Sequence, residues 1–497
     1  MAVVQLNERV PSAPALVRIW KGGPDRFASQ GEQKNQQETD LCHRTETVAQ
    51  SYGRFIANAD LASFPSDVAE YGKMLVASTL ASAALGSTLQ SSKLIRQLEK
   101  ERGGFPVSTV WFGGWDRLPA VAAARLNGLM SDAAASDDSD LRNIVHSGTQ
   151  ACAAAIAVGE ACKASGAQVL EAVIAGYEVA GNINTAMIGG LQRKGFHGCV
   201  VATFAAAAAA ARLLKLQPDQ TAHALVLAAT SVGGLHAVAA TSLAREYHAG
   251  NAAMMGVSAA EAAKHGYTAD LAGFEMPRGF FDTLGTGSHA QDVVGQLGRR
   301  WSLQTELGIK LVPGGSPFHA VAEAAAIAAQ EGDLDVADIK EIEFTLPDYP
   351  FPGPKHPTDL IGIAHSPFYF AAAGAADRGY GWQHALPEKI ADPRIRSLFD
   401  RVTRLDYDVP NKTGFKSGAI VRITTIDGAV HEASVLAPKG AAVRGIHWAE
   451  LRQKYEALMP CGGVSAKHVA ASFNQIQDMN ALTSIRDLID TIKADTP

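Results

Sequence analysis

Apolar residues recur at helical spacing through much of the chain, beginning near Glu46. The segments with this spacing are 68–85, 150–163, 167–188, 203–216, 221–232 and 250–265. Breaker pairs end some of them, as at Ser165-Gly166 and Gln217-Pro218. Because these segments are rich in alanine, the helices can approach one another closely. The pattern therefore predicts a compact helical bundle over residues 45–273.

The pattern changes near Phe274, where glycine and proline become frequent and strand-like alternation begins. The alternating apolar residues are Ile342, Phe344 and Leu346. Two further strand-like segments, 419–426 and 430–436, flank Asp427-Gly428, which is a strong hairpin signal. We expect a smaller α/β domain over residues 274–437.

The sequence returns to helical spacing after Pro438, at 447–458 and 481–492. The predicted fold class is therefore mainly α with α+β. Residues 438–497 return to the helical bundle, and the α/β part is an insertion that would act as a lid domain. Residues 346–365, rich in proline and glycine, are expected to form an extended loop, and residues 1–44 a poorly ordered extension.

Composition excludes several function classes. The formal charge of −6 offers no basic footprint for nucleic acid. The apolar run 204–214 is bounded by Arg212 and Lys215, well short of the ~20 residues that a membrane crossing needs. Five cysteines without CxxC spacing argue against zinc or iron–sulfur sites and suit a reducing cytosol. We expect a soluble cytoplasmic protein, with a mitochondrial location as the alternative.

One stretch, 137–146, gathers ionisable side chains within an alanine-rich apolar region. Its charged residues are Asp137, Asp138, Asp140, Arg142 and His146. Charge runs usually face water, so composition alone favours a solvated loop between helices. A functional cluster is the alternative, because further candidates occur elsewhere: His197, Arg245, His248 and Lys310. A metal site at Asp137, Asp138 and His146 lacks an obvious fourth ligand, so no metal is predicted.

Each candidate also has a structural interpretation. His197 lies between Gly195 and Gly198 and would suit an ordinary loop. Arg245 and His248 are three residues apart and would suit a pair on a helix surface, and Lys310 would suit a solvated position. Asp137 or Asp138 would serve as a helix cap, and His319 is expected to be structural.

Taken in order, several motifs resemble those of the MmgE/PrpD family. Asn127-Gly128, Asp137-Asp138 and His146 resemble its N-G, D-D and H segment, and Gly195-Phe196-His197 resembles its G-[WF]-H element. Three later motifs also resemble family elements. They are the stretch from Arg245 to Ala253, which resembles K-x-x-H-x-G-x-A-A, Lys310-Leu311-Val312-Pro313 with His319, which resembles K-x-x-P followed by H, and Ser366-Pro367-Phe368. The chain departs from the family pattern at Ala135, where members commonly carry aspartate, and at Arg245 and Met254.

The resemblance implies a helical domain with an α/β lid, a cleft between them, a homodimer, no cofactor, and a small di- or tricarboxylate as substrate. His146 or His197 would act as acid or base, since an imidazole titrates near neutral pH. Arg142, Arg245, His248 and Lys310 would bind substrate, and Asp137 or Asp138 would orient a catalytic group.

The resulting hypothesis is a cofactor-independent dehydratase of the 2-methylcitrate dehydratase type. An epimerase or decarboxylase of a related polycarboxylate, such as iminodisuccinate or cis-aconitate, is the first alternative. A homologue that binds carboxylates without catalysis is the second, favoured by the changes at Ala135 and Met254.

Overall fold

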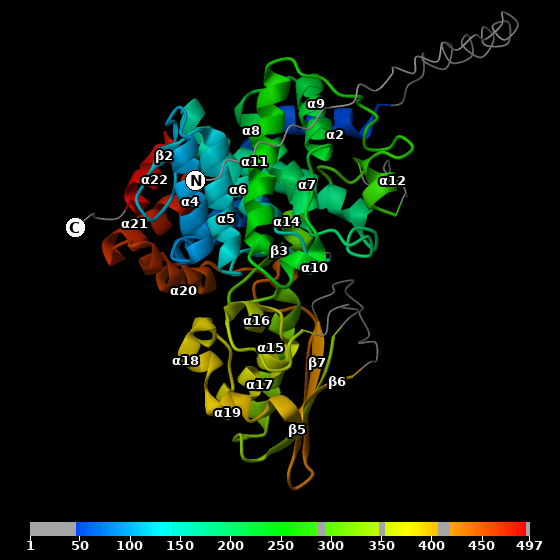
Figure 1. Cartoon of the computed structure of the whole chain (residues 1–497), viewed down its shortest axis with the longest axis vertical. Helices are drawn as coiled ribbons and strands as arrows, with labels where there is room; N and C mark the ends of the chain where they lie inside the picture. The colour runs from blue at the N-terminus through cyan, green and yellow to red at the C-terminus, as the bar shows by residue number, and fades with distance from the viewer. Residues whose placement is uncertain (1–45, 143, 287–293, 347–352, 406–417, 494–497) are drawn as a thin grey trace, which may run out of the picture. The chain divides into compact units, whose positions relative to one another are not determined.

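Helices dominate the protein, as the apolar periodicity predicted. The computed structural model describes residues 46–142, 144–286, 294–346, 353–405 and 418–493, so the prediction for residues 1–44 lies outside it. The long helices before residue 270 are α2 (Val48–Ala57), α3 (Ser66–Gly86), α4 (Gln90–Arg102), α5 (Ala120–Ala133), α6 (Ser147–Cys162), α7 (Gly166–Met187), α8 (Cys199–Leu213), α9 (Pro218–Ala229) and α11 (Ala244–Lys264). Figure 1 shows them packed side by side in the upper part of the view.

Small side chains allow these helices to pack closely. The alanine run of α8, Ala205 to Ala211, is completely buried. Gly256 of α11 faces α8 so closely that a Cβ atom there would lie 2.6 Å from the carbonyl oxygen of Thr203. In the described ranges no helix is both long and apolar enough to cross a lipid bilayer.

The C-terminal helices share this core. They are α20 (Trp448–Leu458), α21 (Ala466–Gln477) and α22 (Ile485–Ile492). Leu451, Tyr455, Phe473 and Ile489 belong to the same buried cluster as the helices before residue 270. The described residues after the α/β part therefore pack into the helical core.

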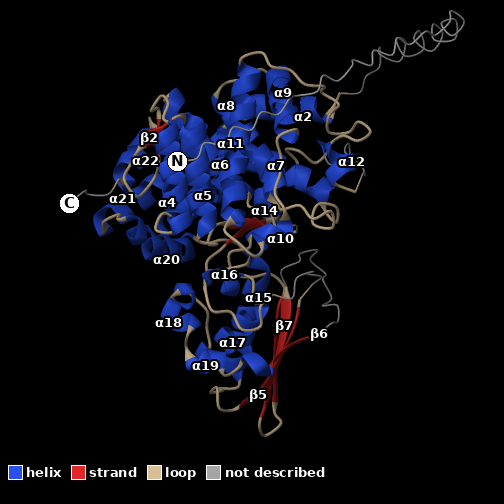
Figure 2. Ribbon diagram, viewed as in Figure 1, coloured by secondary structure: helices blue, strands red, loops and turns tan. Residues whose placement is uncertain are grey.

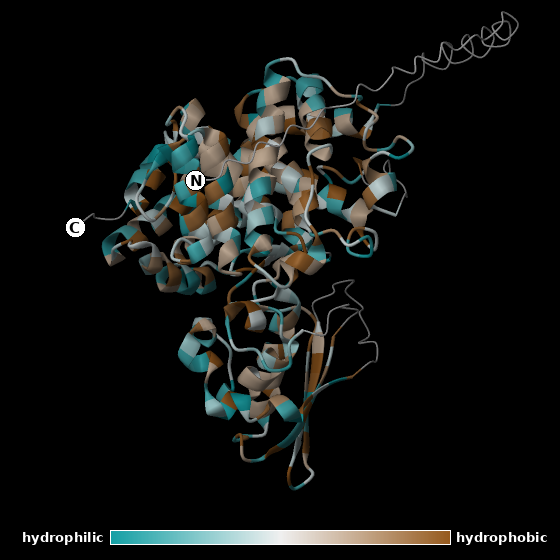
Figure 3. Ribbon diagram, viewed as in Figure 1, coloured by the Kyte–Doolittle hydropathy of each residue, from teal (hydrophilic) through white to brown (hydrophobic). Residues whose placement is uncertain are grey.

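A second buried cluster lies in the α/β part. Its sheet has the order β6-β5-β7-β8, drawn in red in Figure 2. The strands are β5 (Ile339–Thr345), β6 (Val402–Leu405), β7 (Ala419–Thr425) and β8 (Val430–Val435). β5 pairs with β6 in parallel and with β7 antiparallel, and β7 and β8 form the predicted hairpin. Helices α15 (Ser316–Glu331) and α17 (Pro367–Asp377) supply most of the other buried residues, and brown hydrophobic segments run along the sheet in Figure 3.

Short elements complete the described chain: β1 (Ser108–Thr109), β2 (Arg117–Leu118), β3 (Asp138–Asp140), β4 (Leu307–Ile309), α10 (His236–Ala239), α12 (Phe280–Leu284), α14 (Ser302–Thr305), α16 (Leu360–Ala364), α18 (Pro387–Ile390) and α19 (Pro393–Arg396). Helix α16 corrects the prediction of a continuous loop over 346–365. Asp359 caps this helix by accepting a hydrogen bond from the Gly362 amide at 2.7 Å. Residues 347–352 of that stretch lie outside the described part.

The acidic stretch 137–146 is also not the solvated loop that composition favoured. Asp138, Ser139 and Asp140 form β3, which pairs antiparallel with β4. Asp137, Asp138 and Asp140 are each only 1% exposed. Arg142 and the Gly148 and Thr149 amides, all within the same part of the sequence, stabilise Asp140 and Asp138 inside the protein, and the distant Lys310 stabilises Asp137.

Candidate active site

Four helix N-termini meet at one small cavity of about 60 Å³. His146 is the N-cap of α6, His197 lies just before α8, Arg245 is in the first turn of α11, and Ser316 opens α15. Lys310, which directly follows β4, also lines the cavity. The N-terminus of a helix carries partial positive charge, although at α6 the Asp138 carboxylate already binds the Gly148 and Thr149 amides. Together with the cationic side chains, these helix ends make the cavity suited to an anion.

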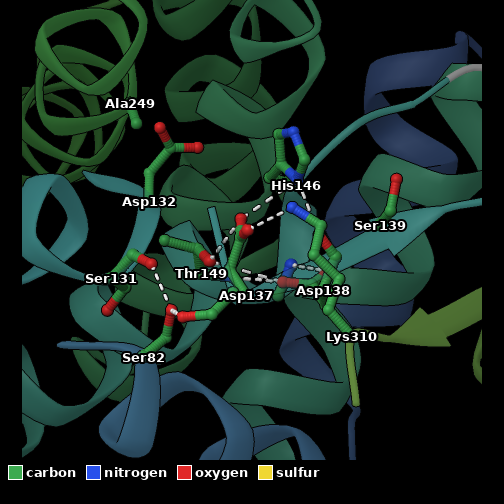
Figure 4. Close-up of polar contacts among 12 residues, drawn as sticks. Ser82, Ser131, Asp132, Asp137, Asp138, Ser139, His146, Thr149, Ala249 and Lys310 are labelled. Atoms are coloured by element: carbon green, nitrogen blue, oxygen red, sulfur yellow. Dashed lines mark hydrogen bonds and ion pairs between the residues drawn. The ribbon is translucent and has the colours of Figure 1, made fainter. Parts of the chain in front are cut away.

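Asp137 links two of the cavity residues. Its carboxylate accepts a hydrogen bond from Lys310 Nζ at 2.6 Å and lies 3.0 Å from Nδ1 of His146 (Figure 4). Nδ1 of His146 also lies 2.6 Å from the carbonyl oxygen of Asp138. Two oxygen partners at Nδ1 indicate that this nitrogen carries a proton, so Nε2 remains for exchange with a ligand.

These contacts shift the pKa values of Asp137 and His146 in opposite directions, which favours a carboxylate beside an imidazolium. Burial raises the pKa of Asp137, but the charges and hydrogen bonds of His146 and Lys310 outweigh burial and hold that pKa well below its usual range. Burial lowers the pKa of His146, yet the Asp137 carboxylate outweighs burial, and the net effect raises the pKa. The raised pKa favours the imidazolium form of His146, which can donate a proton.

Asp138 has a structural position behind this pair. Its carboxylate accepts hydrogen bonds from the amides of Gly148 and Thr149, both at 3.0 Å, and so caps α6. Burial and the nearby Asp137 charge raise the pKa of Asp138 to about 6. Thr149 Oγ1 lies within 3.4 Å of both aspartates, which connects the pair to the first turn of α6.

His197 has the opposite character to His146. Burial and then the neighbouring His146 charge hold the pKa of His197 well below its ordinary value, so the ring is neutral. Its Nδ1 accepts a hydrogen bond from the Cys199 amide at 3.4 Å and lies 3.0 Å from Cys199 Sγ. From these contacts we assign the proton to Nε2, which makes His197 a neutral donor toward a ligand.

Arg245 is fixed before any ligand arrives. Its Nη2 donates to the carbonyl oxygens of Asp132 and Ala133 at 2.9 and 2.8 Å, and its Nε lies 3.3 Å from the Asp132 carboxylate. A guanidinium held in this way loses little side-chain entropy when it binds a carboxylate.

Asp132, Asp137 and His146 also have ligand atoms within 4.8 Å of one another, a spacing that a metal ion can bridge. However, Asp137 already binds Lys310 and His146, and Asp132 already pairs with Arg245. These cations supply the positive charge that the carboxylates require, so we assign no metal to the cluster.

Not every predicted site residue reaches the cavity. Arg142 binds Asp140 at 2.7 Å and donates to Thr185 and to the carbonyl oxygen of Gly181. His248 lies with its ring centroid 5.8 Å from that of His197, behind the cavity surface. Asp137 and Asp138 contact His146 but are not part of the lining. His319 is buried against Gly314, as a structural histidine would be.

Two lining histidines were missed from the sequence. His236 opens α10, and His365 follows α16. His236 comes shortly after Gly233-Gly234, and this glycine pair is the only local signal for it. His365 carries no such signal, because its position depends on how the segment around α16 folds back over the helix ends.

Two family models match most of the chain. The MmgE/PrpD N-terminal domain matches residues 50–292, and the MmgE/PrpD C-terminal domain matches residues 313–478. The chain therefore belongs to the MmgE/PrpD family, as its motifs predicted.

The curated relatives are cis-aconitate decarboxylases or similar to them. The Homo sapiens cis-aconitate decarboxylase is 28% identical over 402 residues, covering 77% of this chain and 82% of the human protein. The cis-aconitate decarboxylase-like protein oryM of Aspergillus oryzae is 28% identical over 409 residues, covering 76% and 83%. The Aspergillus terreus cis-aconitate decarboxylase is 28% identical over 288 residues, covering 55% and 56%.

Proposed function

We propose that this protein is a lyase that decarboxylates a small unsaturated polycarboxylate of the cis-aconitate type. The observation that carries the proposal is one anion-suited cavity lined by His146, His197, Arg245 and Lys310. The relatives favour decarboxylation over the dehydratase that the motifs first suggested, because they are named as cis-aconitate decarboxylases. The dehydratase and epimerase hypotheses require the same cavity and are outcomes of the test below.

Binding begins with charge. Arg245 offers Nη1, the guanidinium nitrogen that Asp132 and Ala133 do not use, to one substrate carboxylate, and Lys310 offers a point charge to another. The four helix N-termini add a favourable field for both. Around these cations the lining is small and apolar, with Ala135, Ala239 and Ala364. A carboxylate placed against these alanines is poorly solvated, which favours its loss as neutral CO₂.

The chemistry then needs one proton. When CO₂ leaves from the methylene carboxylate, the electrons of the broken C–C bond form a new C=C bond. The former double-bond carbon becomes a carbanion whose charge spreads onto its own carboxylate. The neutral Nε2–H of His197 and the Arg245 guanidinium stabilise that developing charge. Nε2 of the His146 imidazolium delivers its proton to the carbon and regains one from solvent for the next turnover.

The α/β part would act as a lid in this scheme. It contributes Gly314, Gly315 and His365 to the cavity lining, while the helical part contributes His146, His197 and Arg245. Closing the cavity from both parts would exclude water and strengthen the electrostatic interactions.

The test is incubation of the purified protein with cis-aconitate, followed by proton NMR and measurement of released CO₂. We expect CO₂ and a single unsaturated dicarboxylate. Hydration of cis-aconitate, or dehydration of 2-methylcitrate in a parallel sample, would instead support the dehydratase. If no member of a panel of polycarboxylates is converted while binding persists, the non-catalytic homologue is the better description.

A further inference from the structure

A second cavity, of about 270 Å³, lies beside the anion cavity. The two cavities share five lining residues: Ala135, Ala239, Arg245, Ala364 and His365. The two cavities therefore adjoin, and three of the residues they share are alanines, which have the shortest side chains after glycine. We call the second cavity the side cavity; a group attached to a substrate at Arg245 would pass these alanines to reach it.

The side cavity has an apolar lining of its own. The apolar residues found only in it are Leu89, Ala133, Leu243, Leu360 and Ile361. They come from the segment before α4, the end of α5, the start of α11 and helix α16. Leu243 and Ile361 are 48% and 38% exposed, so both side chains are accessible to a ligand in the side cavity.

The acidic residues of the side cavity already have partners. Asp359 caps α16 through the Gly362 amide, and Glu246 lies 3.9 Å from Arg245. Neither therefore needs a cationic ligand. Gln90, Ser91 and Ser242 add uncharged polar groups to the lining, and Ser242 donates to the Val238 carbonyl oxygen. The other lining residues outside the anion cavity are apolar, and the cavity adjoins Arg245, which would hold a carboxylate.

We propose that the side cavity binds an alkyl chain, longer than a methyl group, carried by the polycarboxylate substrate. This inference rests on the proposed function, because it assumes that the charged head of the substrate binds at Arg245 and Lys310. Arg245 and Lys310 hold the carboxylates of the substrate, and its alkyl chain passes the shared alanines to reach Leu243 and Ile361. The substrate class is then an alkyl-substituted tricarboxylate.

The inference is tested by binding, independently of turnover. Tricarballylate and its butyl-substituted form are titrated into the wild-type protein in a calorimeter. Each buried methylene contributes several-fold to affinity, so we expect the butyl compound to bind roughly 30-fold more tightly. Equal affinity for the two compounds would overturn the side-cavity proposal.

Two variants test whether the alkyl group of the ligand occupies the side cavity. Ile361→Glu places a charge on the wall of the side cavity and should remove most of the butyl preference while tricarballylate affinity stays within about twofold. Val238→Glu is the matched control, since Val238 is 45% exposed, lies in α10 and lines neither cavity. It should leave both affinities unchanged, and a butyl preference that survives Ile361→Glu would contradict the proposal.

The two proposals fail in different ways. If cis-aconitate is decarboxylated but the butyl group brings no gain in affinity, only the side-cavity proposal is wrong. If neither tricarboxylate binds and no CO₂ is released, the proposed function fails and the side-cavity proposal fails with it.

Discussion

At the level of single residues, the site contains two histidines whose pKa values are shifted in opposite directions. Asp137 raises the pKa of His146, while burial and then the nearby His146 charge lower the pKa of His197. Groups whose environments push their pKa values apart are suited to different roles in one reaction. In our account His146 delivers the proton and His197 stabilises the developing negative charge.

The pH dependence of kcat/KM should follow from this arrangement. His146 must be protonated, so activity falls as the pH rises through its raised pKa. In Asp137→Asn the carboxylate charge is lost, and burial and the Lys310 charge then lower the pKa of His146. The alkaline limb should therefore move to lower pH by roughly 1 to 3 units. An unmoved limb in a variant with wild-type circular dichroism would rule out Asp137 as the group that tunes His146.

Replacing either histidine should cost catalysis more than folding. His146→Gln and His197→Gln each remove a group from the cavity lining, and we expect kcat to fall roughly 100- to 10,000-fold. His265→Gln, at an exposed position that ends α11, is the control and should keep full activity. Rates are measured by CO₂ release, and a near-normal kcat for His146→Gln would remove it from the mechanism.

At the scale of elements, apolar periodicity predicted the long helices and the β7–β8 hairpin because those patterns are local. Boundaries were less accurate: α11 begins at Ala244 rather than 250, since Arg245 and His248 interrupt its apolar spacing. The pairing of β3 with β4 was missed, because it joins segments about 170 residues apart in the chain. His236 and His365 were also missed, because their positions in the cavity lining depend on how separate segments of the chain fold together.

The start of α6 shows how tightly an element can hold the site. A Cβ atom on Gly148 would lie 2.4 Å from Leu75 Cδ1 and 2.8 Å from the Asp138 carboxylate. Gly148→Ala should therefore lower the free energy of unfolding by about 1–3 kcal/mol and weaken the cap that Asp138 provides. In Gly233→Ala the new Cβ would meet nothing within 4 Å, so its stability should stay close to wild type. Urea unfolding of the two variants gives the comparison, and equal losses would contradict it.

At the scale of the whole molecule, the C-terminal helices support the site from behind. Lys454 of α20 is 1% exposed, donates to Ser78 Oγ at 2.7 Å and also donates to the carbonyl oxygen of Ser136, next to Asp137. Burial lowers the pKa of Lys454 to about 7. The folded protein therefore binds fewer protons at this group than the unfolded chain does when the pH lies between about 7 and 10.5.

The lowered pKa of Lys454 predicts how the stability of the protein changes with pH. Because the unfolded state binds more protons, the contribution of Lys454 to stability should rise with pH across that window, by at most about 1.4 kcal/mol per unit. The unfolding free energies of the wild type and Lys454→Met are measured by urea titration at several pH values from about 7 to 9. The wild-type value minus the variant value should rise with pH. A difference that stays flat would show that Lys454 keeps an ordinary pKa in the folded protein.

The central claim is that helix starts far apart in the chain enclose one site for a polycarboxylate. The most direct measurement is a crystal structure of the protein with bound tricarballylate. We expect one carboxylate on Arg245, another on Lys310, and the carbon skeleton within reach of Nε2 of both His146 and His197. Tricarballylate bound at another surface, with these four side chains free of it, would show that these residues do not form the substrate site.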